Sequence, residues 1–556
     1  MRLCWFIFFL SLIFSQGIWG QAVVGEVKLK KYSTDGFELY PYDYLDPYGR
    51  SIYVLHDPSF KASEGEVVQI WQPERGSYRD RIMRKYNILM ELMWETEIEL
   101  ERDEEILHFY QTDTTIVLLT SKSERSIDRY SVVAHKFGLE SGKLFATNVW
   151  WMINSTDDHG LQFHLAKDQS RMLLYHFVHE KEHRNVSLYY DYIRRDDQAG
   201  YRATGVHRAH FVVLGKDGSK LSEGFLEPGN PKMTVLDCQT DRENNVYLTA
   251  YEKPEKIKVL QWNAQTKEQR ELTYEVGIPF HELLDSYTTH LPPTIGLGEK
   301  VYLSFSERVK RGKAKGTKGF DIVCFDFMTY EVDTRRHLSI NSTLQVLVEK
   351  QREEFGLKPV PRFDEFMIRD IVEMADSSLW LITQKYHSQS APGANYASPD
   401  IGPADLKTEE LILYEFGLEG KPKQAIVIPT IQYVQSMAER VSQFYHLEID
   451  EQTRTARLIT REPSGDKLRG PERIYFRRID LNTREVTDRI QIYHGKRRDQ
   501  YLLRAFIDWL NPAIVSFLVI DGDSGNAYSI AVNVEMEPVE EEEESGSRRK
   551  RNARKK

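Results

Sequence analysis

The chain has 556 residues and a formal net charge of −10; 41% of its residues are hydrophobic and 28% are charged. Seven Glu and seven Lys or Arg cancel over residues 535–556, so the acidic excess belongs to the body of the protein. This distribution argues against a general role in binding nucleic acid. The aromatic content of 12% favours pleated, half-buried strands over a helical bundle.

Residues 1–20 have the pattern of a secretory signal peptide. Arg2 provides a positive start, and Cys4–Phe14 form an apolar run that is too short for a stable membrane span. Small residues favour cleavage after Gly20 or Ala22. We therefore expect an exported protein that is periplasmic, outer-membrane-associated or extracellular. An uncleaved membrane anchor is the alternative.

Residues 21–534 carry one phrase that returns roughly every 55 to 78 residues, the mark of a radial or stacked repeat. In each copy a turn containing Asp, Gly, Asn or Pro precedes a short run of β-branched, aromatic or leucine residues. The apolar runs are Ile52–Leu55, Ile116–Leu119, Met172–Tyr175, Val246–Leu248, Val301–Leu303, Leu379–Ile382, Ala456–Ile459 and Ile514–Ile520.

A second kind of strand lies between these runs and ends in a tight turn. Examples are Lys258–Trp262, Phe320–Phe325, Leu411–Tyr414 and Ile474–Arg477. Asp, Asn and Gly in the following turns suit hairpin geometry. Each repeat thus holds two hairpins, which predicts an all-β propeller of seven four-stranded blades, with six to eight compatible with the spacing. A terminal strand at Val23–Leu29 is a candidate to close the ring.

Three stretches depart from the simple β pattern. Tyr78–Tyr110 has helical propensity, but the period-two alternation of Met93–Leu100 favours a strand there. Thr343–Phe355 has helical spacing within an insertion. Gln384–Pro403 is rich in Ser, Ala, Gly and Pro, which predicts a long loop.

Several phrases resemble a group of uncharacterised, secreted, propeller-like proteins of Gram-negative bacterial envelopes. They are Phe163–Asp168, Asp241–Leu248, Lys318–Phe320 and Phe366–Ile371. The resemblance spans about residues 46–534 and implies an exported propeller without a transferable catalytic signature. Where these relatives often have Gly-Gly, this chain has Ser377-Ser378, which does not threaten the fold.

The segment His179-Glu180-Lys181-Glu182-His183 satisfies the H-E-x-x-H pattern of zinc peptidases. On a helix, His179 and His183 would share one face and a Zn²⁺ ion, and Glu180 would activate the bound water. The flanking residues have strand composition, however, and no downstream ligand is evident. We therefore expect the charged tip of a β-hairpin, with His176 belonging to the same surface cluster.

Other suggestive segments are also better explained as structural elements. Asp521–Asn526 resembles the start of a calcium loop but lacks the carboxylate at its twelfth position, so a hairpin turn is expected. The basic Lys310–Lys318 lacks phosphate-loop spacing and predicts a hairpin tip. Trp150-Trp151 and a tyrosine cluster could stack on sugar rings, but packing between blades is the expected role. The tyrosines are Tyr40, Tyr42, Tyr44 and Tyr48.

The two cysteines outside the signal peptide and the C-terminal tail have distinct sequence contexts. Cys238 and Cys324 lie in apolar, strand-like contexts that favour buried thiols, with a disulfide as the alternative. Residues 535–556 are acidic and then basic, so we expect a disordered tail. Its alternative role is electrostatic contact with an anionic membrane surface.

The sequence thus favours a non-enzymatic propeller that binds a protein or an envelope component, because loop tips vary freely on a rigid scaffold. The alternatives are a carbohydrate-binding or carbohydrate-cleaving propeller and, less favoured, a zinc metalloprotease. No catalytic, cofactor-binding or metal-binding residue is assigned.

Overall fold

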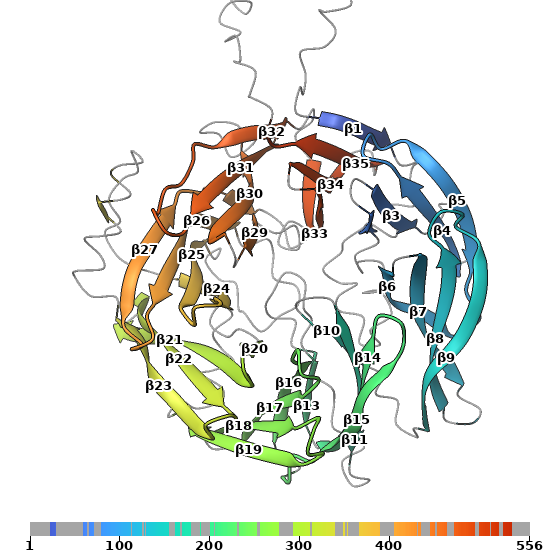
Figure 1. The fold of residues 1–556 in the computed structure, drawn as a ribbon. Helices are drawn as coiled ribbons and strands as arrows, with labels where there is room; N and C mark the ends of the chain where they lie inside the picture. Colours follow the sequence, from blue (N-terminus) through green and yellow to red (C-terminus); the bar gives the residue numbers. More distant parts are fainter. Residues whose placement is uncertain are drawn as a thin grey trace, which may run out of the picture.

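A computed structural model describes residues 23–28 and most of 59–535. Gaps of five residues or more within the second range lie at 72–78, 155–161, 180–188, 191–200, 277–292, 340–348, 354–365, 390–404, 435–444, 464–471 and 495–499. The described strands form eight antiparallel sheets arranged as blades around a ring (Figure 1). The fold is an all-β propeller.

Each blade runs from an innermost strand near the ring axis to an outermost strand at the rim. Blades 1 to 4 contain, in chain order, β2 Ser59–Ser63, β3 Glu66–Trp71, β4 Asp80–Tyr86 and β5 Leu92–Glu99; β6 Glu104–Gln111, β7 Thr115–Glu124, β8 Arg129–Gly138 and β9 Leu144–Asn154; β10 Gln162–Leu165, β11 Arg171–His179, β14 Val206–Gly215 and β15 Lys220–Leu226; and β12 Tyr189–Tyr190, β13 Tyr201–Thr204, β16 Thr234–Thr240, β17 Val246–Glu252, β18 Lys256–Trp262 and β19 Gln269–Glu275.

Blades 5 to 8 repeat the pattern. They contain β20 Thr294–Ile295, β21 Lys300–Arg311, β22 Ala314–Asp326 and β23 Glu331–Ser339; β24 Phe366–Glu373, β25 Leu379–Gln389, β26 Asp405–Phe416, β27 Pro422–Ile428 and β28 Gln432–Val434; β29 Tyr445–Asp450, β30 Thr455–Pro463, β31 Glu472–Asp480 and β32 Ile490–His494; and β33 Gln500–Asn511, β34 Ile514–Asp521, β35 Asn526–Asn533 and β1 Val23–Lys28.

The structure has eight blades, where seven were favoured and six to eight were compatible with the spacing. From Ile116–Leu119 onward, every recurring apolar run lies on the second strand of a blade, except that in blade 4 the additional hairpin β12–β13 makes it the fourth. Ile52–Leu55 lies outside the described residues. The second strand of blade 1 is instead β3. Dividing the chain length by an average repeat length gave too few blades, because the segments between strands vary in length. The recurring apolar run, in contrast, occurs once in each of blades 2 to 8.

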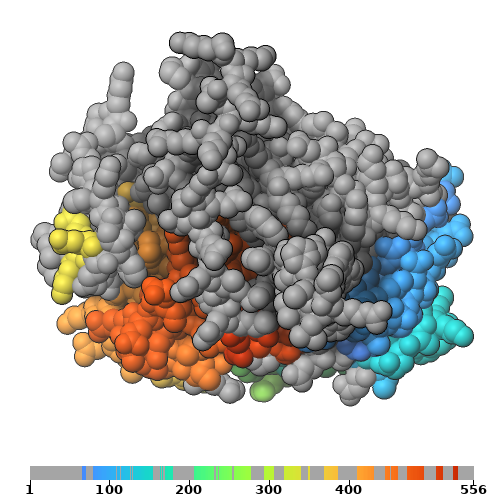
Figure 2. Space-filling view, turned by 90° about the horizontal axis from the view of Figure 1, so that it is seen from above, coloured from blue at the N-terminus to red at the C-terminus, as the bar shows by residue number. Residues whose placement is uncertain are grey.

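The ring is closed by its two ends, as the pattern at Val23–Leu29 suggested. β1 pairs with β35 as the outermost strand of blade 8, with Val27 opposite Ser529. The innermost strand of that blade, β33, contacts β2 of blade 1. Seen edge-on, the blue N-terminal blades and the red C-terminal blade are neighbours (Figure 2). The first blade is therefore held to the last by strand pairing and by packing.

Apolar cores lie between consecutive blades, and the structure describes seven of them, joining blade 1 to 2 and so on through 7 to 8. β11 shows why central strands are continuously apolar. Leu173 packs toward blade 4, whereas its neighbour Leu174 packs toward blade 2. A strand buried on both faces has no solvent side, so alternation is lost. Each recurring run thus supplies two interfaces.

The ambiguous stretches are only partly as expected. The β interpretation of residues 78–110 is confirmed by β4, β5 and β6. Glu349, Lys350 and Glu353 are helical, within the segment that has helical spacing. The loop predicted at Gln384–Pro403 begins too early, because β25 continues to Gln389 through pairing with β26. Its residues 390–403 lie outside the described part.

Blade 4 receives an additional hairpin from blade 3. The chain leaves β11, forms β12 and β13, and returns as β14. β13 pairs with the inner edge of β16, where Ala203 lies opposite Val235. The excursion therefore fastens blade 3 onto the inner strand of blade 4, close to the ring axis (Figure 1).

Both described cysteines are free and buried, which confirms the expected thiols; Cys238 lies in β16 and Cys324 in β22. Burial raises the pKa of each thiol. Within the described residues, no helix has the length and apolar character needed to cross a bilayer.

Candidate functional site

The zinc-like segment begins on a strand. His179 ends β11 and lies opposite Val206 of β14, so the helix needed to bring two histidines to one face is absent at the first of them. Residues 180–183 lie outside the described part. The expectation that His176 belongs to a surface cluster was wrong, because its side chain is only 2% exposed within β11. In the described portion of the chain, no three His, Cys, Asp or Glu side chains group as metal ligands.

The other suggestive segments are structural where the structure describes them. The hairpin at Asp521–Asn526 is confirmed, with these two residues paired across β34 and β35. The basic segment is a hairpin tip as well, with Arg311 opposite Ala314. The tail beyond residue 535 and the tyrosines between residues 40 and 48 lie outside the described residues.

Trp150 and Trp151 pack between blades, as expected. The register of β9 against β8 shifts between Trp151 and Val149, and the extra residue is Trp150. Both rings join the apolar cluster between blades 2 and 3. A Cβ added at Gly218, where φ is +85°, would lie 2.3 Å from the Trp150 ring, so the turn after β14 needs glycine there. The pair is therefore not an open stacking platform.

Two aspartates occupy matching positions on the strands that precede the continuously apolar β17 and β25 in blades 4 and 6. In β16 and β24 the register shifts by one residue just before Asp237 and Asp370. Each carboxylate accepts a hydrogen bond from the next backbone N–H, at 2.8 Å from Cys238 and 2.7 Å from Ile371. Such bulges redirect side chains and often lie beside functional sites. The described inner strands thus place half-buried carboxylates close to the ring axis in blades 4 and 6.

Asp237 and His164 have perturbed acidity. Burial raises the pKa of Asp237 to about 7, although hydrogen bonds from Gln239 and Cys238 oppose this shift. Burial lowers the pKa of His164 to about 4, which leaves its imidazole neutral at pH 7. His164 lies on β10, which contacts β16. Perturbed titratable groups on neighbouring inner strands are the chemical feature most typical of a functional centre.

A polar chain crosses blade 2 from its innermost strand. Glu104 Oε1 lies 2.7 Å from His135 Nε2 and accepts a 2.5 Å hydrogen bond from Thr120 Oγ1. Burial raises the pKa of this carboxyl, but the bonds from His135 and Thr120 outweigh burial and hold the pKa at about 2. The glutamate is therefore ionised and structural.

This depressed pKa predicts acid sensitivity. Because the folded pKa of Glu104 lies below its ordinary 4.5, the carboxylate stabilises the protein above pH 4.5, and that contribution is lost as pH falls toward 2. The loss should amount to about 3 kcal/mol. Urea unfolding across this pH range should show it in the natural chain, and Glu104→Gln should flatten it. An unchanged pH slope in the variant would refute the assignment.

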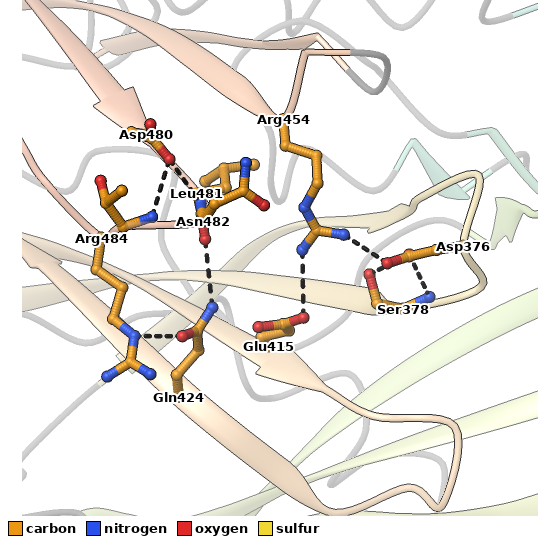
Figure 3. A network of polar contacts seen from close by, with 10 residues as sticks. Asp376, Ser378, Glu415, Gln424, Arg454, Asp480, Leu481, Asn482 and Arg484 are labelled. Carbon is orange, nitrogen blue, oxygen red and sulfur yellow. Dashed lines mark hydrogen bonds and ion pairs between the residues drawn. The ribbon is translucent and has the colours of Figure 1, made fainter.

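Blades 6 and 7 are joined by polar contacts between turns (Figure 3). Arg454, in the β29–β30 turn, donates to Asp376 at 2.5 Å and to the buried Glu415 at 3.3 Å. Arg484 donates to Gln424, which in turn donates to the Leu481 carbonyl. This network therefore connects blades 6 and 7 through their turns.

The Ser377-Ser378 departure lies beside this network. Ser377 has φ of +62°, the left-handed conformation that glycine adopts at less cost. Ser378 compensates by donating from both N and Oγ to Asp376. The turn is therefore preserved without Gly-Gly.

The outer rim contains one unusual strand. β9 is the outermost strand of blade 2, and Leu144, Phe145, Val149 and Met152 are 53%, 61%, 54% and 58% exposed. Residues 144–154 include no Asp, Glu, Lys or Arg. Outer edges normally carry charges that discourage pairing with other chains. β9 is therefore a candidate interaction surface.

Sequence reasoning did not identify Asp237, His164 or the β9 rim. The available signal for Asp237 was a lone carboxylate inside the apolar run Val235–Cys238. The signal for β9 was eleven uncharged residues in a chain that is 28% charged. His164 offered no local signal, because its low pKa depends on burial in the folded protein.

No protein-family model and no curated protein matches the chain. Solved structures that resemble it include a post-proline cleaving enzyme from Rickettsia typhi (11% identity, 88% of this chain, 61% of that chain, TM-score 0.34). An ulvan lyase (8%, 77% and 91%, 0.35) and the β-propeller domain of the Trilobed protease from Pyrococcus furiosus (10%, 78% and 96%, 0.32) are also similar. The chain spans about three fifths of the length of the prolyl peptidases it matches. Similarity this low carries no argument about activity, and no family is shown.

Proposed function

We propose that this protein is an exported, non-enzymatic binding scaffold that docks a protein or cell-envelope component through the β9 rim. The uncharged, exposed outer strand Leu144–Asn154 is the observation that supports it. An apolar strand edge offers unpaired backbone groups and side-chain contacts to a partner. Export in a Gram-negative envelope, and contact of the basic tail with anionic lipid, belong to the same proposal and rest on the sequence patterns alone.

Photo-crosslinking tests the docking surface. A photoreactive phenylalanine analogue at position 145 should yield discrete adducts in the envelope of the producing cell. The same analogue at Leu418, which is 64% exposed in a turn of blade 6, is the matched control and should yield none. Absence of adducts at position 145, or equal adducts at both positions, would contradict the proposal.

A carbohydrate-binding or carbohydrate-cleaving propeller is the second candidate. Asp237 favours it, because a carboxyl with a pKa of about 7 can donate a proton to a glycosidic oxygen at neutral pH. Glycoside cleavage also uses an opposing carboxylate across the scissile bond. The matching Asp370 lies in a different blade, and its carboxylate accepts a hydrogen bond from Ile371 of the same strand. No opposing carboxylate is therefore identified for Asp237 among the described residues, and we favour the binding-scaffold function.

A further inference from the structure

The rim strands differ in how they discourage pairing. β5 carries three glutamates, β19 carries Arg270, Glu271 and Glu275, and β23 carries four charged residues. β9 has 11 residues and none of these charges, and among the described strands only β8 pairs with it, along its inner side. Charged side chains on an edge strand are the usual protection against another chain. Among the described outer strands of five residues or more, only β9 and the five-residue β32 lack Asp, Glu, Lys and Arg, and the longer β9 offers the more extensive uncharged edge to a protein partner.

We propose that the partner is a second copy of this chain, packed β9 against β9 about a two-fold axis near Asn148 and Val149. This inference rests on the proposed docking role of the same rim. A two-fold interface brings the same patch of both copies together. Any charged residue near the axis would then meet its own like charge, and β9 is the long outer strand that avoids this penalty.

The distribution of apolar residues fits antiparallel self-pairing. Exposed Leu144 and Phe145 lie at the start of β9, and exposed Met152 lies near its end. Antiparallel pairing sets the start of one copy against the end of the other, so these groups cover one another. Asn148, which is exposed near the centre, carries both a donor and an acceptor and can bond across the axis.

The bulges define how the contact is made. The register of β9 against β8 shifts on both sides of Ala146–Val149, near Phe145 and at Trp150. Regular backbone edge is therefore limited to this central stretch. The apolar side chains at either end supply the remaining contact.

Sedimentation velocity of the mature full-length chain over a concentration series tests the inference. We expect a monomer–dimer equilibrium, weakened about tenfold or more by Val149→Lys, because like charges would face each other at the axis. Asn148→Asp, nearly isosteric, should weaken it similarly without disturbing the fold. Leu418→Lys, an equally exposed apolar position on another blade, should dimerise like the natural chain.

The outcomes separate this inference from the docking role beneath it. A natural chain that stays monomeric, or a Val149→Lys variant that dimerises normally while still folded, overturns self-association. If that chain nevertheless crosslinks to a different protein from position 145, the docking role stands and only the partner is wrong. If position 145 yields neither a doubled chain nor another adduct, both fail.

Discussion

Deletion of β1, Val23–Lys28, is expected to cause the largest loss of stability in this protein. The strand pairs with β35 along its length and joins the start of the chain to the last blade. A six-residue strand that contributes about 1 kcal/mol for each lost backbone hydrogen bond gives a loss on the order of 4 kcal/mol. Denaturant unfolding monitored by tryptophan fluorescence measures it.

The matched control removes six residues from the tail, Arg551–Lys556, and should leave the unfolding midpoint unchanged. The β1 deletion should also expose the edge of β35 and promote association. A midpoint that moves no more than in the tail deletion would show that the packing of β2 on β33 closes the ring by itself.

Asp241→Ala is expected to cause the largest loss from a single substitution. Its carboxylate accepts hydrogen bonds from the backbone N–H groups of Glu243 and Asn245, from Asn245 Nδ2 at 2.8 Å and from Tyr247 Oη at 2.6 Å. Asn245 and Tyr247 are each 2% exposed, so their donors would be left without acceptors away from water. The free energy of unfolding should fall by about 3 kcal/mol.

Two further variants isolate the buried network. Tyr247→Phe removes one hydroxyl and preserves the ring, so it should cost about 1 kcal/mol. Asp480, in the turn drawn in Figure 3, accepts similar hydrogen bonds from the N–H groups of Asn482 and Thr483. These bonds are exposed, whereas Asp241 is buried, so Asp480→Ala should cost much less than Asp241→Ala. Equal losses for the two aspartates would mean that the turn alone, and not the buried side chains, determines the effect.

The propeller was predictable because a blade repeats a local pattern. Val246–Leu248 and Leu379–Ile382 indicate strands at the centre of a blade, because a strand buried between two neighbouring blades must be apolar on both faces. The eight blades lie within the expected range of six to eight, but seven were favoured because the segments between strands vary in length and an average repeat length conceals one repeat. The β12–β13 excursion was also missed, since only the partner β16 on another blade makes it a strand.

The candidate sites were less accessible to sequence reasoning. We expected His176 in a surface cluster because His179 and His183 follow it in the sequence. Its side chain is instead buried, because it lies within β11. The pKa values of Asp237 and His164 arise from burial that the fold creates, not from neighbours in the chain. The β9 rim could have been recognised from its missing charges, but only the sheet order makes it an outer edge.

Closure by β1 also sets the order in which the protein can be completed. β1 is synthesised near the beginning and its partner β35 near the end, about 500 residues later. At roughly 5–20 residues per second, the first strand waits some 25–100 seconds for its partner. Throughout that interval β1 remains available to a neighbouring nascent chain. Two chains that exchange β1 would each complete the other's ring, so domain swapping is the characteristic misassembly of this architecture.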